Sequence, residues 1–427
     1  MEYEGVSMEQ KNMRKKLYIA GLVGEIMEWF DFTVYGFFAL IIAQNFFPAE
    51  DHFVSLVAAF AAFAIGFLMR PIGAFIFGYL GDRYGRKKVL TTSMFLMAFP
   101  SLIIALSPTY ETIGIFAPIL LVLMRMLQGI SVGGEHTGSI IYLAELSDYK
   151  KRAFAASVPF IGTILGVLMG SLIGVGIFTF FSHESIVNWA WRIPFALGVL
   201  IAFVGIMIRK HLPESNANDT DSSTVMPITE IFQKHLSAFI KVFLMNLPFA
   251  VGFYTVFIYN PIWMQQFLHD SKQYTLEINS IALIVAMLVM PLSAILSNKI
   301  GRKPLLLFAT GGLTLFSWPL YHFMLSDLPF HTLIGQSFFA LFIGIFMGTI
   351  GVVMVELFSR NIRVSAVSIA FNISFAVFGG TAPMIATWLI HSTQDNLSLA
   401  WYLSASALIS FLTILTIDET YKTKELD

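Results

Sequence analysis

The sequence predicts an all-α membrane protein with twelve transmembrane helices in two six-helix bundles. Three observations lead to this prediction. The chain of 427 residues is 56% hydrophobic and only 12% charged, whereas soluble domains carry roughly 25% charged residues. Twelve stretches are apolar over the length of about 20 residues that a helical crossing requires. A motif at residues 78–88 returns in weaker form at 297–303, half a chain later, which indicates two similar halves.

The composition also excludes several classes of function. The formal net charge of −1 gives no reason to expect nucleic acid as a partner. The absence of cysteine removes disulfides, thiolate metal sites and cysteine nucleophiles. The chain contains no phosphate-binding Gly-x-x-x-x-Gly-Lys-Ser/Thr loop and no metal-ligand spacing. We therefore expect no cofactor and no metal. A membrane-embedded enzyme would need a catalytic cluster, and this sequence offers none, so we do not expect an enzyme.

The predicted spans divide into two groups of six around one polar segment. Residues 211–235 are rich in turn formers and poor in apolar side chains, so they are predicted to be a linker. We expect a cytoplasmic N-terminal segment at 1–16, bundles at 17–210 and 236–418, and a cytoplasmic tail at 419–427. The spans themselves are predicted at 17–46, 53–80, 89–107, 112–146, 153–181, 189–209, 236–266, 276–298, 304–325, 331–358, 364–391 and 397–417.

The distribution of Lys and Arg predicts the orientation of the chain. Basic residues gather in the N-terminal segment, in alternate connections and in the tail, while the opposite connections contain only Lys272. Cytoplasmic loops carry the excess of positive charge. Both termini are therefore predicted to be cytoplasmic, which requires the even number of spans that the apolar stretches give.

Three acids follow one another at every third position of the first span: Glu25, Glu28 and Asp31. The helical period places them on one stripe about 9 Å long. Each acid near a helix centre costs roughly 2.5–3.5 kcal/mol on insertion, so three on one face indicate a polar cavity in which a carboxyl group can exchange a proton. Glu135 in the fourth span is a further candidate for proton coupling. The alternative is that these acids pair with a buried arginine and only hold helices together.

The fourth span carries Arg125 and Gln128 on one helix face. A guanidinium in a membrane cavity can bind a carboxylate through two hydrogen bonds, so Arg125 is a candidate anion anchor. The alternative is an ion pair with Asp31 or Glu28. We interpret Arg70, which precedes a proline, as structural.

Aromatic residues in the first and seventh spans could surround a substrate ammonium group, or could simply pack. His136 is interpreted as an interior hydrogen-bonded histidine. Polar groups in membrane helices usually face protein or water, which adds further candidates. The remaining predicted substrate-binding residues are Trp29, Tyr35, Tyr142, Tyr254, Tyr259, Trp263 and Asn372.

Several phrases resemble those of one transporter family. They are Glu28-Trp29-Phe30-Asp31-Phe32, Arg70-Pro71-Ile72-Gly73, Gly81-Asp82-Arg83-Tyr84-Gly85-Arg86-Lys87, Arg125-Met126-Leu127-Gln128-Gly129 and Gly301-Arg302-Lys303. With them, nearly the whole chain resembles the major facilitator superfamily, and within it the metabolite:proton symporters. Residues 371–374 look most like the proline/glycine-betaine branch, whereas residues 110–114 look more like the 2-oxoglutarate and citrate branches.

The resemblance implies a proton symporter that imports a small osmolyte such as proline or glycine betaine by alternating access. The alternative is a symporter of a di- or tricarboxylate such as 2-oxoglutarate or citrate. Every substrate of the family carries a carboxylate. The acid-rich first span favours a zwitterion, because a dianion needs more than one cationic anchor. The resemblance also implies a bacterial inner-membrane protein surrounded by lipid, and we expect a functional monomer.

The repeated loop is implied to be a gate. The resemblance implies that Asp82 latches the two halves together on the cytoplasmic side. There its carboxylate can lie against the positive N-terminal end of a helix. Asn298 replaces this acid in the second copy, so the second latch is expected to be weaker. The basic residues of the loop also set topology. The predicted gating residues are Gly78, Asp82, Arg83, Gly85 and Arg86 in the first copy and Asn298, Gly301 and Arg302 in the second.

Overall fold

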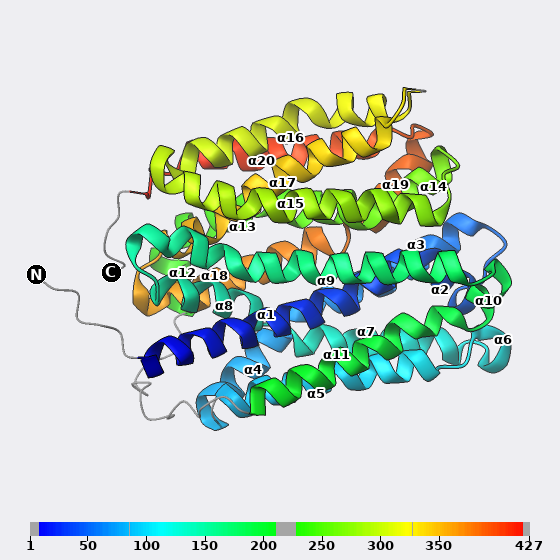
Figure 1. Cartoon of the computed structure of the whole chain (residues 1–427), viewed down its shortest axis with the longest axis horizontal. Helices are drawn as coiled ribbons and strands as arrows, with labels where there is room; N and C mark the ends of the chain where they lie inside the picture. The colour runs from blue at the N-terminus through cyan, green and yellow to red at the C-terminus, as the bar shows by residue number, and fades with distance from the viewer. Residues whose placement is uncertain (1–7, 85, 211–227, 327, 422–427) are drawn as a thin grey trace, which may run out of the picture.

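The computed structural model describes residues 8–84, 86–210, 228–326 and 328–421, and the elements described are helices joined by short connections (Figure 1). The first half contains α1 (Met8–Phe37), α2 (Ala39–Phe46), α3 (His52–Leu68), α4 (Arg70–Tyr84), α5 (Arg86–Leu106), α6 (Tyr110–Ile113), α7 (Phe116–Ser131), α8 (Glu135–Glu145), η1 (Tyr149–Lys151), α9 (Arg152–Phe180), α10 (His183–Asn188), η2 (Ala190–Arg192) and α11 (Ile193–Lys210). The second half contains α12 (Ile228–Lys234), α13 (Leu236–Met245), η4 (Pro248–Gly252), η5 (Tyr254–Tyr259), α14 (Asn260–Phe267), α15 (Lys272–Ile300), α16 (Arg302–Met324), α17 (His331–Glu356), α18 (Arg360–Ser374), η6 (Phe375–Gly379), α19 (Ala382–Thr393) and α20 (Ser398–Leu415).

The helices confirm the predicted membrane architecture. Within the described residues, 10 helices are long and apolar enough to cross a membrane. The pair Leu22–Phe37 and Ala39–Phe46, bent by 65°, adds an eleventh, and the shorter apolar helix Thr92–Leu106 lies where the third span was predicted. Together these segments follow the order of the twelve predicted spans. The last residues of the predicted linker form α12, and residues 211–227 lie outside the described residues.

Two bundles pack side by side, as the repeated loop suggested (Figure 1). In the first, α1 packs against α9 and α11, and α5 packs against α7 and α11. In the second, α17 packs against α15 and α16, and α16 against α20. The halves meet where α9 lies against α15 and α17, α3 against α19, and α8 against α18. Residues on these facing helices are therefore shared between the two halves.

The first and last described residues lie at the same end of the molecule, which we call the terminal end (Figure 1). The connections near α2, α6, α10 and α14 lie at the opposite end, which we call the distal end. An even number of crossings places both ends of the chain on the same side, as the distribution of basic residues predicted.

Glycines bring α7 very close to α3 and α4. A Cβ atom on Gly129 would lie 1.8 Å from the carbonyl oxygen of Gly66, and one on Gly133 would lie 2.0 Å from the backbone nitrogen of Ala74. Any side chain there would overlap the neighbouring backbone, so close helix approach depends on glycine. This contact brings the polar residues of α7 and α8 toward α1 and α4.

Among the described residues, three short π-helical segments lie within the spans of the second half that face the first. They are η4, η5 and η6. In η6 the backbone nitrogen of Gly380 donates to the carbonyl oxygen of Phe375 at 3.0 Å, five residues earlier. A π-helical turn rotates the side chains that follow it and often occurs at functional sites. Here the π segments carry aromatic rings that contact α1.

Candidate functional site

The three acids of α1 are buried in the centre of the molecule, each with different partners. Glu25 is 0% exposed, and Glu28 and Asp31 are each 2% exposed. A carboxylate oxygen of Glu25 lies 2.7 Å from Nδ1 of His136. Glu28 forms an ion pair with Arg70 at 2.8 Å. Asp31 has neutral partners, which are described with Arg125 below. Burial of all three acids indicates a site isolated from lipid and bulk water.

Arg70 connects the two halves at this site. It is the first residue of α4 and is 1% exposed. Its Nε donates to the Asn372 side chain at 3.4 Å, and the Asn372 amide donates to the carbonyl oxygen of Gly133 at 2.8 Å. The Glu28–Arg70 ion pair corresponds to the alternative in which an acid of the first span pairs with a buried arginine, and it is compatible with the structural interpretation of Arg70. The available signal was a cation inside a predicted membrane span, which is uncommon without a partner.

Arg125 is fully buried on α7 and pairs directly with neither Glu28 nor Asp31. Its Nη1 donates to Gln128 at 2.8 Å, and the Gln128 amide donates in turn to Asp31. The hydroxyl of Ser101 also donates to Asp31, at 2.6 Å. The guanidinium carbon lies 4.5 Å from the ring centroid of Tyr35. Nε and Nη2 of Arg125 have no hydrogen-bond partner among the described residues, and the guanidinium also packs 4.5 Å from the ring centroid of Phe32.

Aromatic rings from both halves surround Trp29. The Trp29 ring lies 6.1 Å from that of Tyr254 and 6.4 Å from that of Phe375. Tyr254 also contacts Phe67 at 5.2 Å, and its buried hydroxyl has no partner in the described part of the chain. We call Trp29, Phe67, Phe249, Tyr254 and Phe375 the aromatic cluster. Sequence periodicity could indicate Trp29 and Tyr254, but not the phenylalanines, in a chain with so many of them.

The other predicted binding residues lie beside this centre or outside it. Tyr35 packs against Arg125, and its hydroxyl donates to the carbonyl oxygen of Ala59 at 2.9 Å, between α1 and α3. Trp263 donates to the carbonyl oxygen of Asn396 at 2.9 Å, near the distal end. Tyr142 is 39% exposed on α8. Glu135 is half-buried at the start of α8, and it is the next residue, His136, that contacts Glu25.

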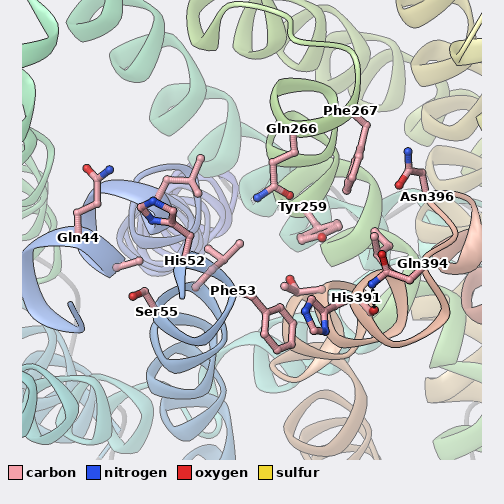
Figure 2. Close-up of a pocket in the computed structure, with 15 residues that line it drawn as sticks. Gln44, His52, Phe53, Ser55, Tyr259, Gln266, Phe267, His391, Gln394 and Asn396 are labelled. Atoms are coloured by element: carbon pink, nitrogen blue, oxygen red, sulfur yellow. Dashed lines mark hydrogen bonds between the residues drawn. The ribbon is translucent and has the colours of Figure 1, made fainter. Parts of the chain in front are cut away.

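A cavity of about 530 Å³ opens at the distal end between the two halves (Figure 2). Helices α2 and α3 form one side, and α14 and α19 form the other. The rings of Phe53 and His391 stack across the halves with centroids 3.7 Å apart. The polar side chains that line the cavity are Gln44, His52, Ser55, Tyr259, Gln266, Thr387, His391, Gln394 and Asn396.

Paired aromatic rings lie between the cavity and the buried acids. Tyr259 lines the cavity, and its ring lies 5.9 Å from that of Phe60 in the other half. Further along η5, Tyr254 lies 5.9 Å from Phe63. Each pair joins α3 to η5, so both pairs cross the boundary between the halves. Arg125 and the three acids are not among the residues that line the cavity.

Polar contacts between the halves close the terminal end. Arg363 of α18 pairs with Glu145 of α8 at 2.6 Å. Arg152 of α9 pairs with Glu356 of α17 at 3.4 Å. Ion pairs thus join the two halves at the terminal end, whereas a cavity lies between them at the distal end.

The second copy of the repeated loop takes part in this closure. The Asn298 amide donates to the carbonyl oxygen of Lys150 at 2.9 Å, across the halves, and receives a bond from Arg302 at 2.7 Å. Gly301 has φ of +107°, a conformation that favours glycine. In the first copy, the structure does not describe Gly85. It also does not describe the side chains of Asp82, Arg83 and Arg86 or the contacts of Gly78. The latch at Asp82 therefore stays a prediction.

Comparisons with known proteins agree with this architecture. The Major Facilitator Superfamily model matches residues 21–383 and 242–425. The "Glycine betaine/proline/ectoine/pipecolic acid transporter OusA" of Dickeya dadantii is 36% identical over 95% of this chain and 83% of its own. The "Proline/betaine transporter" of Salmonella typhimurium is 36% identical over 97% of this chain and 85% of its own.

A solved structure shows the same fold. The crystal structure of a D-xylose-proton symporter, 19% identical in sequence, matches with a TM-score of 0.77 over 97% of this chain and 100% of its own. At that identity the likeness concerns the fold alone. The family model, the relatives and the fold agree: the chain belongs to the Major Facilitator Superfamily and is a multi-pass membrane transporter, not an enzyme.

Proposed function

We propose that the protein is a proton-coupled symporter that imports a zwitterionic osmolyte such as proline or glycine betaine. The observation that carries this proposal is the 36% identity, over nearly the whole chain, to transporters named for these substrates. The buried centre supports it, because it combines one incompletely bonded guanidinium with aromatic faces. Rocking of the two halves about this centre would expose it to each end in turn.

Arg125 is the proposed anchor for the substrate carboxylate. Its free Nε and Nη2 donors can form the paired hydrogen bonds that a carboxylate accepts. Trp29 and Tyr254 offer ring faces to an ammonium group, which binds such faces within about 6 Å. A zwitterion presents both groups together, so it matches both features of the centre.

The same arrangement disfavours a di- or tricarboxylate. The second buried arginine of the centre, Arg70, is already paired with Glu28. A dianion would meet one available guanidinium and nearby acids on α1. The transfer of an uncompensated charge into a buried site is strongly unfavourable. The prediction that a dianion needs a second cationic anchor therefore argues for the osmolyte.

Coupling to protons is proposed to use the acids of α1, with Glu135 as a further candidate. We propose that both termini are cytoplasmic in a bacterial inner membrane, so that the distal cavity faces outward, and that a single chain functions alone. A proton that enters across 100 mV supplies about 2.3 kcal/mol. The loop copies are proposed to stabilise the outward-facing state from the cytoplasmic side.

Transport in proteoliposomes tests the proposal. With acid outside, we expect labelled proline or glycine betaine to accumulate, and we expect collapse of the proton gradient to abolish accumulation. Unlabelled osmolyte should compete, while 2-oxoglutarate and citrate should not. Stronger competition by the carboxylates would transfer the assignment to the alternative substrate class, and an initial rate unchanged by gradient collapse would refute symport.

Substitution of Arg125 tests the anchor in the same assay. We expect Arg125→Gln to raise the KM for osmolyte at least tenfold, because a charged hydrogen bond contributes about 1.5–3 kcal/mol. Arg125→Lys should restore only part of the affinity, since lysine cannot form the paired contact. The matched control is Arg360→Gln, an exposed arginine at the start of α18. An unchanged KM in Arg125→Gln would show that the carboxylate binds elsewhere.

A further inference from the structure

The Glu25–His136 pair differs from the other two acids in its charge balance. Glu28 contacts the guanidinium of Arg70. Asp31 is linked to Arg125 through Gln128. Among the described residues, Glu25 has no arginine as a hydrogen-bond or ion-pair partner. Its partners are Nδ1 of His136 at 2.7 Å and the indole nitrogen of Trp29 at 3.2 Å.

The number of protons on this pair determines its net charge. One proton more than carboxylate and neutral imidazole makes the pair neutral overall, either as acid with imidazole or as carboxylate with imidazolium. Without that proton the pair carries a full negative charge at a site where Glu25 is 0% and His136 is 1% exposed. An uncompensated buried charge is strongly unfavourable. A closed site around this pair is therefore compatible with the neutral pair and costly for the charged one.

The surroundings of the pair strengthen this argument. The His136 ring lies 5.0 Å from Phe160 and 5.1 Å from Phe371. Nε2 of His136 and the second oxygen of Glu25 are buried without a hydrogen-bond partner among the described residues. A deprotonated pair would thus face aromatic rings with part of its hydrogen-bonding capacity unused, which adds to the cost.

Other charged groups on the packed helices have partners or lie elsewhere. Nearest are Glu28 and Arg70, which neutralise each other in their ion pair. Glu135 precedes His136 at the half-buried start of α8. The ionisable residues that α8, α9, α17 and α18 contribute at the terminal end form two cross-half ion pairs, Glu145 with Arg363 and Arg152 with Glu356, and Arg360 is exposed.

The pair also lies at the boundary that must open and close. Glu25 and His136 belong to the first half, whereas Phe371 and Phe249, which cover the histidine, belong to the second. Separation of the halves would admit water to the pair, and closure removes it. We infer that Glu25 and His136 together hold the coupled proton, and that the pair must be protonated for the halves to close around substrate. This inference rests on the proposed symport and identifies its proton site.

Two assays in proteoliposomes separate proton coupling from folding and substrate binding. Accumulation against a gradient requires proton movement, whereas counterflow exchange of labelled for unlabelled osmolyte requires only that the halves close and open. Glu25→Gln imitates the protonated acid. We expect it to retain counterflow within threefold of the unmodified protein and to reduce acid-driven accumulation at least tenfold.

A second variant tests whether His136 contributes to the proton site. In His136→Gln the carboxyl group must hold the proton without imidazole, so we expect the pH of half-maximal uptake to shift from that of the unmodified protein. A purely structural role for His136 would lower the amount of active protein without moving this profile. Matched controls are Glu277→Gln, a carboxyl on α15 bonded to Gln273, and His322→Gln, an exposed histidine on α16. Both should behave as the unmodified protein.

The outcomes distinguish the inference from the proposed function. Undiminished acid-driven accumulation in Glu25→Gln, or an unchanged pH profile in His136→Gln, would overturn the proton site while symport stands. Osmolyte uptake by the unmodified protein without proton movement would overturn symport, and the inference with it. If Glu25→Gln does not fold, as judged by gel filtration and counterflow, the pH profile of His136→Gln decides alone.

Discussion

At the scale of single residues, the partners of the buried charged side chains come from helices that are far apart in sequence. The spacing of Glu25, Glu28 and Asp31 placed the three acids on one stripe, and the structure confirms that this stripe is buried. Their partners could not be predicted in the same way, because no periodicity relates a residue of α1 to Arg70 on α4 or His136 on α8. Only the observation that membrane acids need partners was available from sequence.

The Glu28–Arg70 pair provides a test at this scale. We expect Glu28→Gln or Arg70→Gln alone to lower the free energy of unfolding by about 3–5 kcal/mol, because each leaves an uncompensated buried charge. The double variant should lose less than either single variant, since both charges are then absent. Thermal melting of the purified protein in detergent measures the three variants against the unmodified chain.

Arg360→Gln, which removes an exposed charge, is the control for the arginine variant. Its free energy of unfolding should lie within about 0.5 kcal/mol of that of the unmodified protein. If the double variant were as unstable as the two single losses added together, the two side chains would not act as a pair. The assignment of Arg70 as the counter-charge of Glu28 would then be wrong.

At the scale of helices, the predicted spans are present, but three of them are irregular. The span predicted at 17–46 is bent by 65°, and those predicted at 236–266 and 364–391 contain π-helical segments. Hydropathy measures only transfer into lipid, so it does not report backbone bonding. Pro248, Pro261 and Pro383 were the available signals, because proline removes a helix hydrogen bond.

Close packing of α7 against α3 and α4 gives a prediction for a single glycine. A methyl group on Gly129 would meet the backbone of Gly66, which cannot move without moving α3. We expect Gly129→Ala to lower the free energy of unfolding by about 1–3 kcal/mol, the usual cost of overpacking. Thermal melting in detergent measures this loss of stability. Osmolyte uptake should be measured as well, because α7 also carries Arg125.

Gly138→Ala is the matched control, since an added Cβ on this α8 glycine meets nothing within 4 Å. Alanine is the better helix former, so Gly138→Ala should melt at the same temperature or slightly higher. Equal melting of the two variants would show that α7 has room to move away from α3.

At the scale of the whole molecule, the number of spans and the two-bundle fold followed from general rules, because lipid requires long apolar helices and each crossing reverses the chain. The relative position of the halves could not be predicted. It depends on contacts such as Glu145 with Arg363 at one end and Phe53 with His391 at the other. These contacts join distant segments, and a transporter must break and remake them, so one sequence has to allow more than one arrangement.

The absence of cysteine makes this arrangement measurable, because a single introduced cysteine has no background. Gln266→Cys places a thiol in the distal cavity, where we expect a membrane-impermeant maleimide to label it on whole cells. Adding Arg363→Gln removes a cross-half ion pair at the terminal end, which favours opening there and closure of the cavity. The Arg363 side chain is buried, so we expect labelling to slow by at least about fivefold, the factor that corresponds to a loss of about 1 kcal/mol. Glu184→Cys, exposed on α10, should be labelled equally in both backgrounds. No labelling at Gln266→Cys would contradict the orientation, and faster labelling would contradict coupled closure of the two ends.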